Sequence, residues 1–288
     1  MATVAELLSQ RQQLLACSDS PALDIEILLC HCLQKPGSYL RAWPEVEVPE
    51  QVRQQFQALV ERRMTGEPVA YLIGERGFWS LDLQVNPSTL IPRPETELLV
   101  ELALDKVSAK RSATILDLGT GTGAIALSLA SERSDCEVKA CDIKAEAVAL
   151  AESNRKKHGL SNVDIFQSNW FAAVNGQQFD LIVSNPPYID PADRHLQQGD
   201  VRFEPRSALV SDNKGLADIE TIIQQAPTYL NDNAWLLFEH GYDQAVAVQT
   251  LLAAAGFEKI FTEQDLAGVN RVTGACYTIE ADGAKLYE

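Results

Sequence analysis

The sequence has no long apolar run and no leader of the kind that directs a protein out of the cytoplasm. Nowhere does it approach the roughly 18 consecutive apolar residues that a membrane-spanning helix needs. The first residues, Met1 to Glu6, lack the basic and apolar regions of a secretion signal. These absences predict a cytoplasmic protein with no membrane partner.

Positive charge is also in short supply. Lysine and arginine number 24 against 40 aspartate and glutamate residues, which gives a formal net charge of −16. Because a protein that binds many phosphates needs the opposite balance, no direct nucleic-acid partner is predicted. An acidic surface suits a basic protein partner, whose approach it would steer.

Cysteine and histidine do not fall at the spacings of a common metal site. The stretch Cys30-His31-Cys32 has no second Cys or His pair to complete a zinc site. Without a secretion signal, disulfides are not expected among the six cysteines either. No metal is predicted, and the lack of a coiled-coil or strand-edge signal makes a monomer the expectation.

Short helices are predicted for the first quarter of the chain. Apolar residues recur at helical spacing over 4–15, and Pro21 opens a second helix with Ser20 as its candidate cap. A further helix with one apolar face ends at Gly66. Residues 1–73 are therefore predicted to form a helical bundle.

The pattern then changes to alternation. Leu81, Leu83 and Val85 alternate with polar residues downstream of two glycines, which predicts a β-hairpin linker over 74–89. From residue 90 onward a second domain, 90–288, is predicted.

Strand and helix patterns alternate through this second domain. Strands are expected at 114–118, 137–142, 163–167, 179–184, 234–239, 257–262 and 271–279. Helices are expected near 122–132, 144–157, 215–230 and 242–255. Such alternation predicts an α/β fold with a parallel sheet covered by helices on both faces.

The most informative stretch is a glycine-rich turn that follows the first of these strands. It reads Asp117-Leu118-Gly119-Thr120-Gly121-Thr122-Gly123 and opens a helix. Glycines let a ligand approach the backbone, and a helix N-terminus presents free amides. No Gly-Lys-Ser/Thr follows, so the turn is not a nucleotide-triphosphate loop. A dinucleotide fingerprint remains open, because Gly119, Gly121 and Ala124 satisfy its lenient form.

Two further stretches extend this site along the same edge of the sheet. Asp142 ends the second strand, where an acid accepts hydrogen bonds from the ribose hydroxyls of an adenosine. Asn169 and Trp170 follow the third strand and are candidates to hold an adenine ring. The pattern predicts a bound nucleoside without saying which one.

A rigid corner, Ser184-Asn185-Pro186-Pro187-Tyr188-Ile189, follows the fourth strand. Proline has no backbone N–H to donate to a neighbouring strand, so one interpretation is that Pro186 and Pro187 simply end the strand. The other interpretation is a pocket that binds a planar group between the Asn185 amide and the Tyr188 ring.

Together, the glycine turn, the acid after the second strand and this corner resemble a class I S-adenosylmethionine methyltransferase. The stretches "LIPRPETE" (90–97), "NPPYI" (185–189) and "FEPRSALV" (203–210), after a helical bundle, resemble the PrmC/HemK family. The resemblance covers essentially the whole chain. It implies a Rossmann-like domain of seven strands, the last of them antiparallel, and N5-methylation of the Gly-Gly-Gln glutamine of class I peptide-chain release factors.

The resemblance also assigns roles to residues. S-adenosyl-L-methionine is expected at the turn 119–123, Asp142, Asn169, Trp170 and Asn185. The residues expected to hold the glutamine are Asn185, Pro186, Pro187, Tyr188, Arg93 and Glu95, and the catalytic ones are Asn185, Pro186 and Tyr188. Asn169 departs from the family, which often has an acid there. The roles of Glu97, Glu204 and Arg206, and the choice between binding and helix opening for Arg93 and Glu95, are left open.

Three other functions fit parts of the sequence. An N6-adenine-specific DNA or RNA methyltransferase shares the corner, but it usually needs a target-recognition region. The residues after Tyr188 are largely used to complete the sheet, and the negative net charge is unfavourable for binding nucleic acid. A nicotinamide oxidoreductase fits the glycines and leaves the corner unexplained. A non-catalytic protein that keeps the adenosine site is the third.

Overall fold

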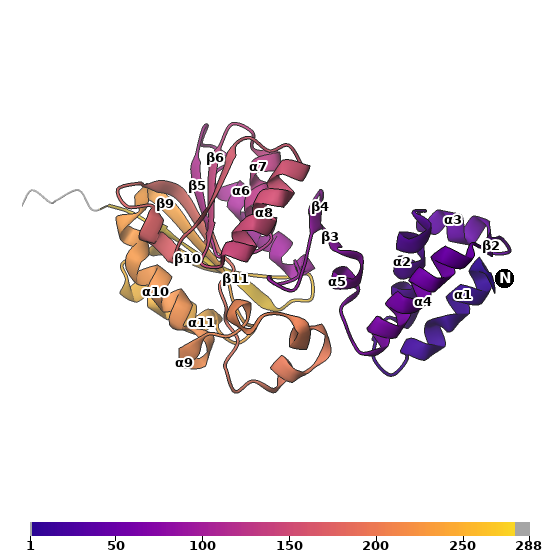
Figure 1. The fold of residues 1–288 in the computed structure, drawn as a ribbon. Coiled ribbons are helices and arrows are strands. Elements are labelled where there is room, and N and C mark those ends of the chain that lie inside the picture. Colours follow the sequence, from indigo (N-terminus) through magenta and orange to yellow (C-terminus); the bar gives the residue numbers. More distant parts are fainter. Residues whose placement is uncertain (1, 280–288) are drawn as a thin grey trace, which may run out of the picture. The chain divides into compact units, whose positions relative to one another are not determined.

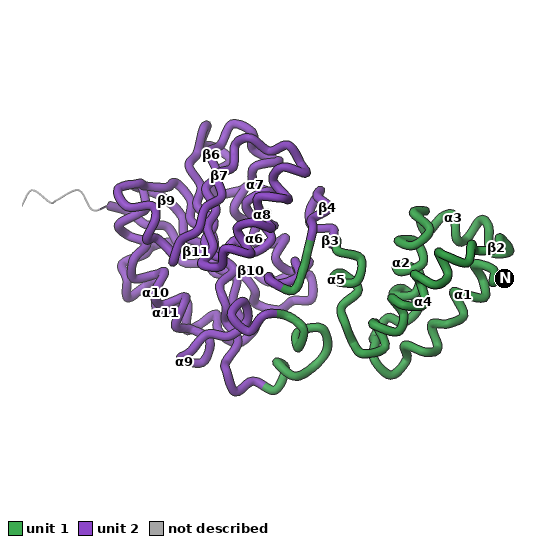
Figure 2. The backbone as a smooth tube through the Cα atoms, in the orientation of Figure 1, with its two compact units in different colours: residues 1–75, 85–87, 194–204 green, residues 76–84, 88–193, 205–288 purple. Residues whose placement is uncertain are grey.

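The computed structural model describes residues 2–279. The chain forms two compact units (Figure 2). The helical unit consists of Met1–Glu75, Val85–Pro87 and Arg194–Glu204, and the sheet unit consists of Arg76–Gln84, Ser88–Asp193 and Pro205–Glu288. Two later stretches of chain thus belong with the N-terminal helices, and Arg194–Glu204 is called the inserted segment below.

The helical unit is built from short helices around its own core. Its α-helices are α1 (Val4–Leu8), α2 (Pro21–Leu33), α3 (Gly37–Ala42), α4 (Glu50–Met64) and α5 (Val69–Ile73). A 3-10 helix, η1 (Ser9–Leu14), continues α1, and β1 (Ala2–Thr3) pairs with β2 (Glu47–Val48). Leu28 and Leu29 of α2 pack in one apolar cluster with Phe56 and Val60 of α4. This spacing of three to four residues buries one face of each helix.

The second helix begins at Pro21, as the sequence predicts, but Ser20 does not cap it with its side chain. The Ser20 hydroxyl instead donates a hydrogen bond to Asp24 Oδ1 at 3.2 Å. A charged carboxylate is a strong hydrogen-bond acceptor, and Asp24 lies buried in the first turn of α2. The prediction that Ser20 caps the helix is therefore wrong, whereas the predicted start of the helix at Pro21 is confirmed.

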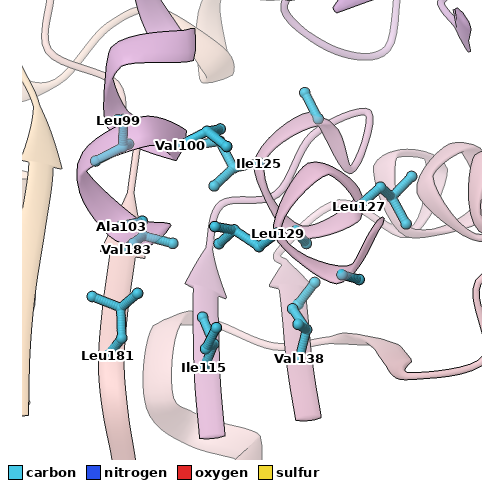
Figure 3. Close-up of a cluster of buried hydrophobic side chains, with 14 of the residues drawn as sticks. Leu99, Val100, Ala103, Ile115, Ile125, Leu127, Leu129, Val138, Leu181 and Val183 are labelled. Carbon is cyan, nitrogen blue, oxygen red and sulfur yellow. The ribbon is translucent and has the colours of Figure 1, made fainter. Parts of the chain in front are cut away.

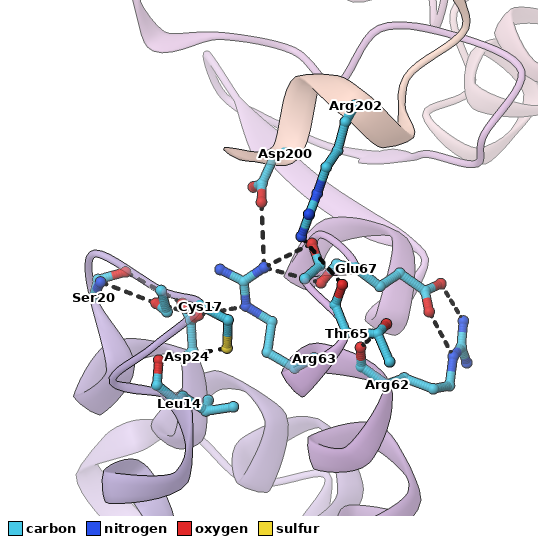
Figure 4. Close-up of polar contacts among 12 residues, drawn as sticks. Leu14, Cys17, Ser20, Asp24, Arg62, Arg63, Thr65, Glu67, Asp200 and Arg202 are labelled. Carbon is cyan, nitrogen blue, oxygen red and sulfur yellow. Dashed lines mark hydrogen bonds and ion pairs between the residues drawn. The ribbon is translucent and has the colours of Figure 1, made fainter. Parts of the chain in front are cut away.

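A buried arginine ties the inserted segment into the helical unit (Figure 4). Arg63, only 6% exposed, donates through Nε to Asp24 Oδ2 at 2.7 Å and through Nη1 to Asp200 Oδ1 at 3.2 Å. Arg202 of the same segment donates to the carbonyl of Thr65 at 3.1 Å. The 3-10 helices η4 (Arg194–Gln197) and η5 (Gly199–Phe203) form this segment.

The sheet unit contains a sheet of seven strands (Figure 1). They are β5 (Thr114–Leu118), β6 (Glu137–Asp142), β7 (Val163–Gln167), β8 (Phe179–Ser184), β9 (Leu230–Glu239), β10 (Glu258–Gln264) and β11 (Asn270–Tyr277), in the spatial order β10-β11-β9-β8-β5-β6-β7. Neighbours from β7 through β9 are parallel, and β11 is antiparallel to both β9 and β10. The predicted seven-stranded fold with an antiparallel last strand is confirmed.

Helices cover both faces of this sheet (Figure 1). They are α6 (Glu97–Lys106), α7 (Ala124–Glu132), α8 (Ala145–Lys157), α9 (Asp212–Gly215), α10 (Ala217–Gln225) and α11 (Ala245–Ala254). Side chains alternate along a strand, so Ile115 and Leu181 enter one core with α6 and α7 (Figure 3). Their neighbours Leu116 and Ile182 enter a second core with α10 and α11.

The predicted hairpin is formed by β3 (Glu75–Phe78) and β4 (Leu81–Gln84). Phe78, Leu81 and Leu83 are buried in the first core of the sheet unit. At the turn, the backbone N–H of Trp79 donates to Glu97 Oε1 at 2.9 Å. Glu97, whose role the sequence leaves open, therefore holds the hairpin turn.

Candidate active site

Most of the predicted site residues meet at one edge of the sheet, because they follow the parallel strands β5, β6, β7 and β8, which all end there. A cavity of about 420 Å³ opens at this edge, within the usual size range of small-molecule sites. The predicted residues that line it are Arg93, Gly119, Thr120, Gly121, Thr122, Asp142, Asn169, Trp170, Asn185 and Pro187. Gly123, Pro186, Tyr188 and Glu95 are not among its lining residues.

The glycine turn adopts backbone angles that only glycine takes at low cost. Gly119, Gly121 and Gly123 have φ values of 75°, 56° and 84°. A Cβ at Gly123 would lie 3.0 Å from Leu127 Cδ1, so this glycine serves the packing of α7 rather than the cavity. A Cβ at Gly121 would meet one atom within 4 Å, Thr89 Cβ at 3.9 Å, so this part of the turn borders open space.

Asp142 closes the turn from the end of β6. Its Oδ2 accepts the backbone N–H of Gly121 at 3.1 Å, and its Oδ1 accepts that of Lys144 at 2.9 Å. Burial raises the pKa of this carboxyl above its ordinary value, and the backbone amides of Lys144, Gly121 and Ile143 oppose the rise. A carboxylate has about four lone-pair positions, so Asp142 keeps capacity for two further donors in the cavity.

Trp170 follows β7 and has an unusual backbone, with φ of 47°. Its carbonyl accepts the Ser168 hydroxyl at 2.8 Å and faces the Cys141 thiol at 3.5 Å. The indole lies close to the glycine turn, since a Cβ at Gly119 would be 3.5 Å from its ring. Asn169 is exposed and begins the 3-10 helix η3 (Trp170–Ala173). Both residues border the cavity.

The corner after β8 is held by polar contacts on both sides. Asn185 Nδ2 donates to Thr96 Oγ1 at 3.3 Å, and the Tyr188 hydroxyl donates to Glu239 Oε1 at 3.0 Å. The backbone carbonyl of Tyr188 accepts Gln244 Nε2 at 2.9 Å. Burial, and then the negative charge of Glu239, raise the pKa of Tyr188, so its hydroxyl keeps its proton.

The residues with open roles fall into different places. Arg93 is half-buried and lines the cavity, whereas Glu95 is exposed outside the lining. Glu204 is buried in the inserted segment of the helical unit. Arg206 has an exposed side chain, and its carbonyl accepts the backbone N–H groups of Leu209 and Val210. Only Arg93 of these residues stands in the site.

Sequence reasoning missed Asn154, a fully buried residue of α8. Its Oδ1 accepts the backbone N–H of Gln84 at 2.7 Å, while its Nδ2 donates to the carbonyls of Gln84 at 3.0 Å and Thr122 at 2.9 Å. One side chain thus joins the hairpin to the glycine turn. The only signal for it was an amide on the otherwise apolar buried face of α8, which it shares with Ala147, Leu150 and Ala151.

Two negative findings concern residues 2–279. Within them, no group of three or more His, Cys, Asp or Glu side chains is placed to hold a metal ion. None of the helices in this part of the chain has the length and apolar character needed to cross a membrane.

Comparison with known proteins agrees with this geometry. Residues 6–74 match the family described as PrmC N-terminal domain, and residues 94–202 match the Methyltransferase small domain. The sheet also resembles that of a methyltransferase from Pyrococcus furiosus, with a TM-score of 0.53, 17% identity and coverage of 77% of this chain and 98% of that chain. A 16S rRNA N2 G1207 methyltransferase from T. Thermophilus, solved with AdoMet and guanosine, gives a TM-score of 0.53 and 18% identity over 70% of this chain and 49% of that one.

Relatives of much higher identity cover more than nine-tenths of the chain. The release factor glutamine methyltransferase of Vibrio cholerae is 55% identical over 92% of this chain and 93% of its own length. That of Pseudomonas aeruginosa is 55% identical over 95% and 98%, and that of Escherichia coli is 50% identical over 93% and 95%. The chain therefore belongs to the family of S-adenosylmethionine-dependent release factor glutamine methyltransferases.

Proposed function

We propose that this protein transfers the methyl group of S-adenosyl-L-methionine to the side-chain amide nitrogen, N5, of the glutamine in the Gly-Gly-Gln motif of class I peptide-chain release factors. S-adenosyl-L-homocysteine is the second product, and the reaction belongs to translation termination in the cytoplasm. The observation that carries the proposal is that Asn185 lines the same cavity as the glycine turn and Asp142. An amide-binding group and a nucleoside site thus share one enclosed space.

The residues of the cavity fit the methyl donor. Gly121 leaves the backbone of the turn open to a ligand. Asp142 provides a carboxylate for the ribose hydroxyls, and Trp170 and Asn169 provide a flat apolar surface and an amide for adenine. When bound, S-adenosylmethionine supplies a methyl group on a positively charged sulfur.

The chemical task of the protein is to make an amide nitrogen react. The lone pair of this nitrogen is delocalised into the carbonyl, so it is a poor nucleophile. In this proposal Asn185 Oδ1, on the cavity wall, accepts one N–H of the glutamine amide. The carbonyl of Pro186 is proposed to accept the other N–H and the Tyr188 ring to lie against the amide plane, which requires the substrate to reach past the present lining, since neither residue borders the cavity. Because prolines fix the backbone, these acceptors are oriented before the substrate arrives.

No general base is needed at the outset. Methylation leaves a positive charge on the nitrogen, whose proton then becomes acidic enough to depart. The acceptors at Asn185 and Pro186 favour this charge because they hold the negative ends of their dipoles toward it.

The test is mass spectrometry of a release factor after incubation with this protein and S-adenosylmethionine. One added methyl mass is expected on the Gly-Gly-Gln peptide. The variant Asn185→Ala should nearly keep its affinity for S-adenosylmethionine, because the glycine turn, Asp142 and Trp170 remain, but lose at least ~100-fold in methylation rate. Asn185→Asp retains the shape and changes only charge and donor capacity. A wild-type rate in Asn185→Ala, or a methyl group on adenine in DNA or RNA rather than on glutamine, would contradict the proposal.

The proposal includes a role for the helical unit. We propose that its surface docks on the release factor away from the Gly-Gly-Gln loop, because a glutamine side chain offers too few atoms for selection. The stretch 43–47 is a suitable surface: Trp43 is 57% exposed, and Val46, 39% exposed, lies between the exposed acids Glu45 and Glu47. Exposed tryptophan is typical of binding hot spots, and the acids suit a basic partner.

A further inference from the structure

Glu239 is a buried acid that the proposed reaction does not use. It is the last residue of β9 and is 1% exposed. Its Oε2 accepts the hydroxyl of Thr96 at 2.6 Å, and its Oε1 accepts the hydroxyl of Tyr188 at 3.0 Å. Burial raises the pKa of Glu239, and the hydroxyls of Thr96 and Tyr188 oppose that rise and favour the carboxylate because they donate to its two oxygens.

Thr96 links this acid to the corner. It ends the 3-10 helix η2 (Pro94–Thr96), is 4% exposed and lines the cavity. A threonine hydroxyl has one hydrogen and two lone pairs. Since that hydrogen goes to Glu239, the oxygen can only accept a second hydrogen bond, and it faces Asn185 Nδ2 at 3.3 Å.

This order of donors decides which end of the Asn185 amide is free. A carboxamide has a donor end and an acceptor end of nearly the same shape, so packing alone does not choose between them. Because Thr96 can only accept, it retains the NH₂ end of Asn185, and Oδ1 becomes the end available to the cavity. The hydrogen bond from Asn185 Nδ2 to the Thr96 hydroxyl, which itself donates to Glu239, also polarises the Asn185 amide. This makes Oδ1 a stronger acceptor.

We propose that Glu239 and Thr96 are positioning residues of the methyl transfer: they fix the Asn185 amide with Oδ1 directed at the substrate N–H, and Glu239 also holds Tyr188. This inference rests on the proposed function, in which Asn185 accepts a hydrogen from the glutamine amide. Neither residue touches the reacting atoms in this scheme; each acts through the corner.

The experiment compares three substitutions in the full-length protein. Thr96→Val keeps the shape and removes the hydroxyl, Thr96→Ser keeps the hydroxyl, and Glu239→Gln replaces one acceptor with a donor. Steady-state methylation of a release factor gives kcat and KM, and calorimetry gives the affinity for S-adenosylmethionine. Thr221→Val, which removes a hydroxyl bonded within α10, is the matched control.

We expect Thr96→Val and Glu239→Gln to lower kcat by roughly 10- to 100-fold, as loss of an oriented polar contact does, with cofactor affinity changed by less than about twofold. Thr96→Ser should recover most of the rate. In an Asn185→Ala background, Thr96→Val should lower kcat by less than about a further twofold, because the side chain that Thr96 orients is already absent. A merely structural role would give the same loss in both backgrounds.

Either of two kinetic results would overturn the inference: a wild-type kcat in folded Thr96→Val and Glu239→Gln, or full additivity with Asn185→Ala. Circular dichroism identifies a variant that does not fold, and Thr96→Ala then takes its place. A ¹⁵N spectrum of the Asn185 side-chain amide, assigned by its loss in Asn185→Ala, tests the orientation without substrate. If the release factor stays unmethylated by the wild-type protein, the proposed function fails, and an amide signal unchanged by Thr96→Val would separately reject the inference.

Discussion

At the scale of single residues, Asp142 is the clearest test of the cofactor site. Its two oxygens already hold the backbone amides of Gly121 and Lys144, and it lines the cavity. Asp142→Ala should weaken S-adenosylmethionine binding by about 1.5–3 kcal/mol, the range for hydrogen bonds to a charged group. Titration calorimetry measures this directly. Unchanged affinity in a folded variant would remove Asp142 from the site.

Asp117 is a second acid of the glycine turn, and it is fully buried. Thr120 Oγ1 donates to its Oδ2 at 2.6 Å. Burial, the largest cause, raises the pKa of Asp117 from 3.8 to about 7. The folded protein therefore binds this proton over a pH range in which the unfolded chain releases it.

The sign of the effect on stability follows from linkage. Since the folded state binds more protons, the free energy of unfolding falls as pH rises from about 4 to about 7. Asp117→Asn does not titrate at this position. Relative to that variant, the wild type should lose on the order of 4 kcal/mol between pH of about 4 and pH of about 8. Urea unfolding of both proteins across this range measures the difference; parallel pH profiles would show that Asp117 has an ordinary pKa.

At the scale of elements, the polar cluster around Arg63 joins α4, α2 and the inserted segment (Figure 4). Arg63 and Asp24 are both buried, while the side chain of Asp200 is 41% exposed. Removal of Arg63 leaves the carboxylate of Asp24 buried with hydroxyl donors from Ser18 and Ser20 but without its arginine, which is costly. Removal of the partly exposed Asp200 leaves Arg63 paired with Asp24.

Arg63→Ala should therefore lower the free energy of unfolding of the helical unit by about 3–5 kcal/mol. Asp200→Ala should cost no more than about 1 kcal/mol, because Arg63 keeps Asp24 and two backbone carbonyls. Urea unfolding followed by circular dichroism compares the two. Equal losses would mean that the buried pair with Asp24 is not the main contribution.

At the scale of the whole molecule, the chain leaves the sheet unit after Asp193 and returns at Pro205. Tyr188 of the corner precedes this excursion, and Ser207 and Ala208, which line the cavity, follow it. The helical unit thus contains chain that is covalently continuous with the site on both sides. If the helical unit binds the substrate protein, the inserted segment is the part of that unit that is linked directly to the two stretches of chain that form the site.

The docking proposal predicts a difference between substrates. A short Gly-Gly-Gln peptide should be a far poorer substrate than the intact release factor, chiefly through a higher KM. Glu45→Lys with Glu47→Lys should reduce activity on the intact factor and leave the peptide rate unchanged. Steady-state kinetics on both substrates decide. Equal kcat/KM for peptide and intact factor would show that the helical unit only covers apolar surface.

Much of this molecule follows from local sequence pattern. Strands β5 to β8 of the seven-stranded sheet lie at the predicted residues. β5 and β8 are short, largely apolar and buried runs, and β6 and β7 alternate apolar with polar residues. The glycine turn, Asp142 and Asn185 could also be found, since each follows directly from a strand end. When strands are parallel, their carboxyl ends meet at one edge, so position in the chain implies position in the site.

Other features depended on the tertiary structure alone. Glu239 and Thr96 are 143 residues apart and share a hydrogen bond, and Arg63 and Asp200 are 137 apart. No local period or spacing relates such residues, because β9 and η2, or α4 and the inserted segment, become neighbours only when the chain folds. The sequence by itself determined the elements and the edge at which the site forms. Only the fold decided which buried donor meets which acceptor, and so which end of Asn185 is left for the substrate.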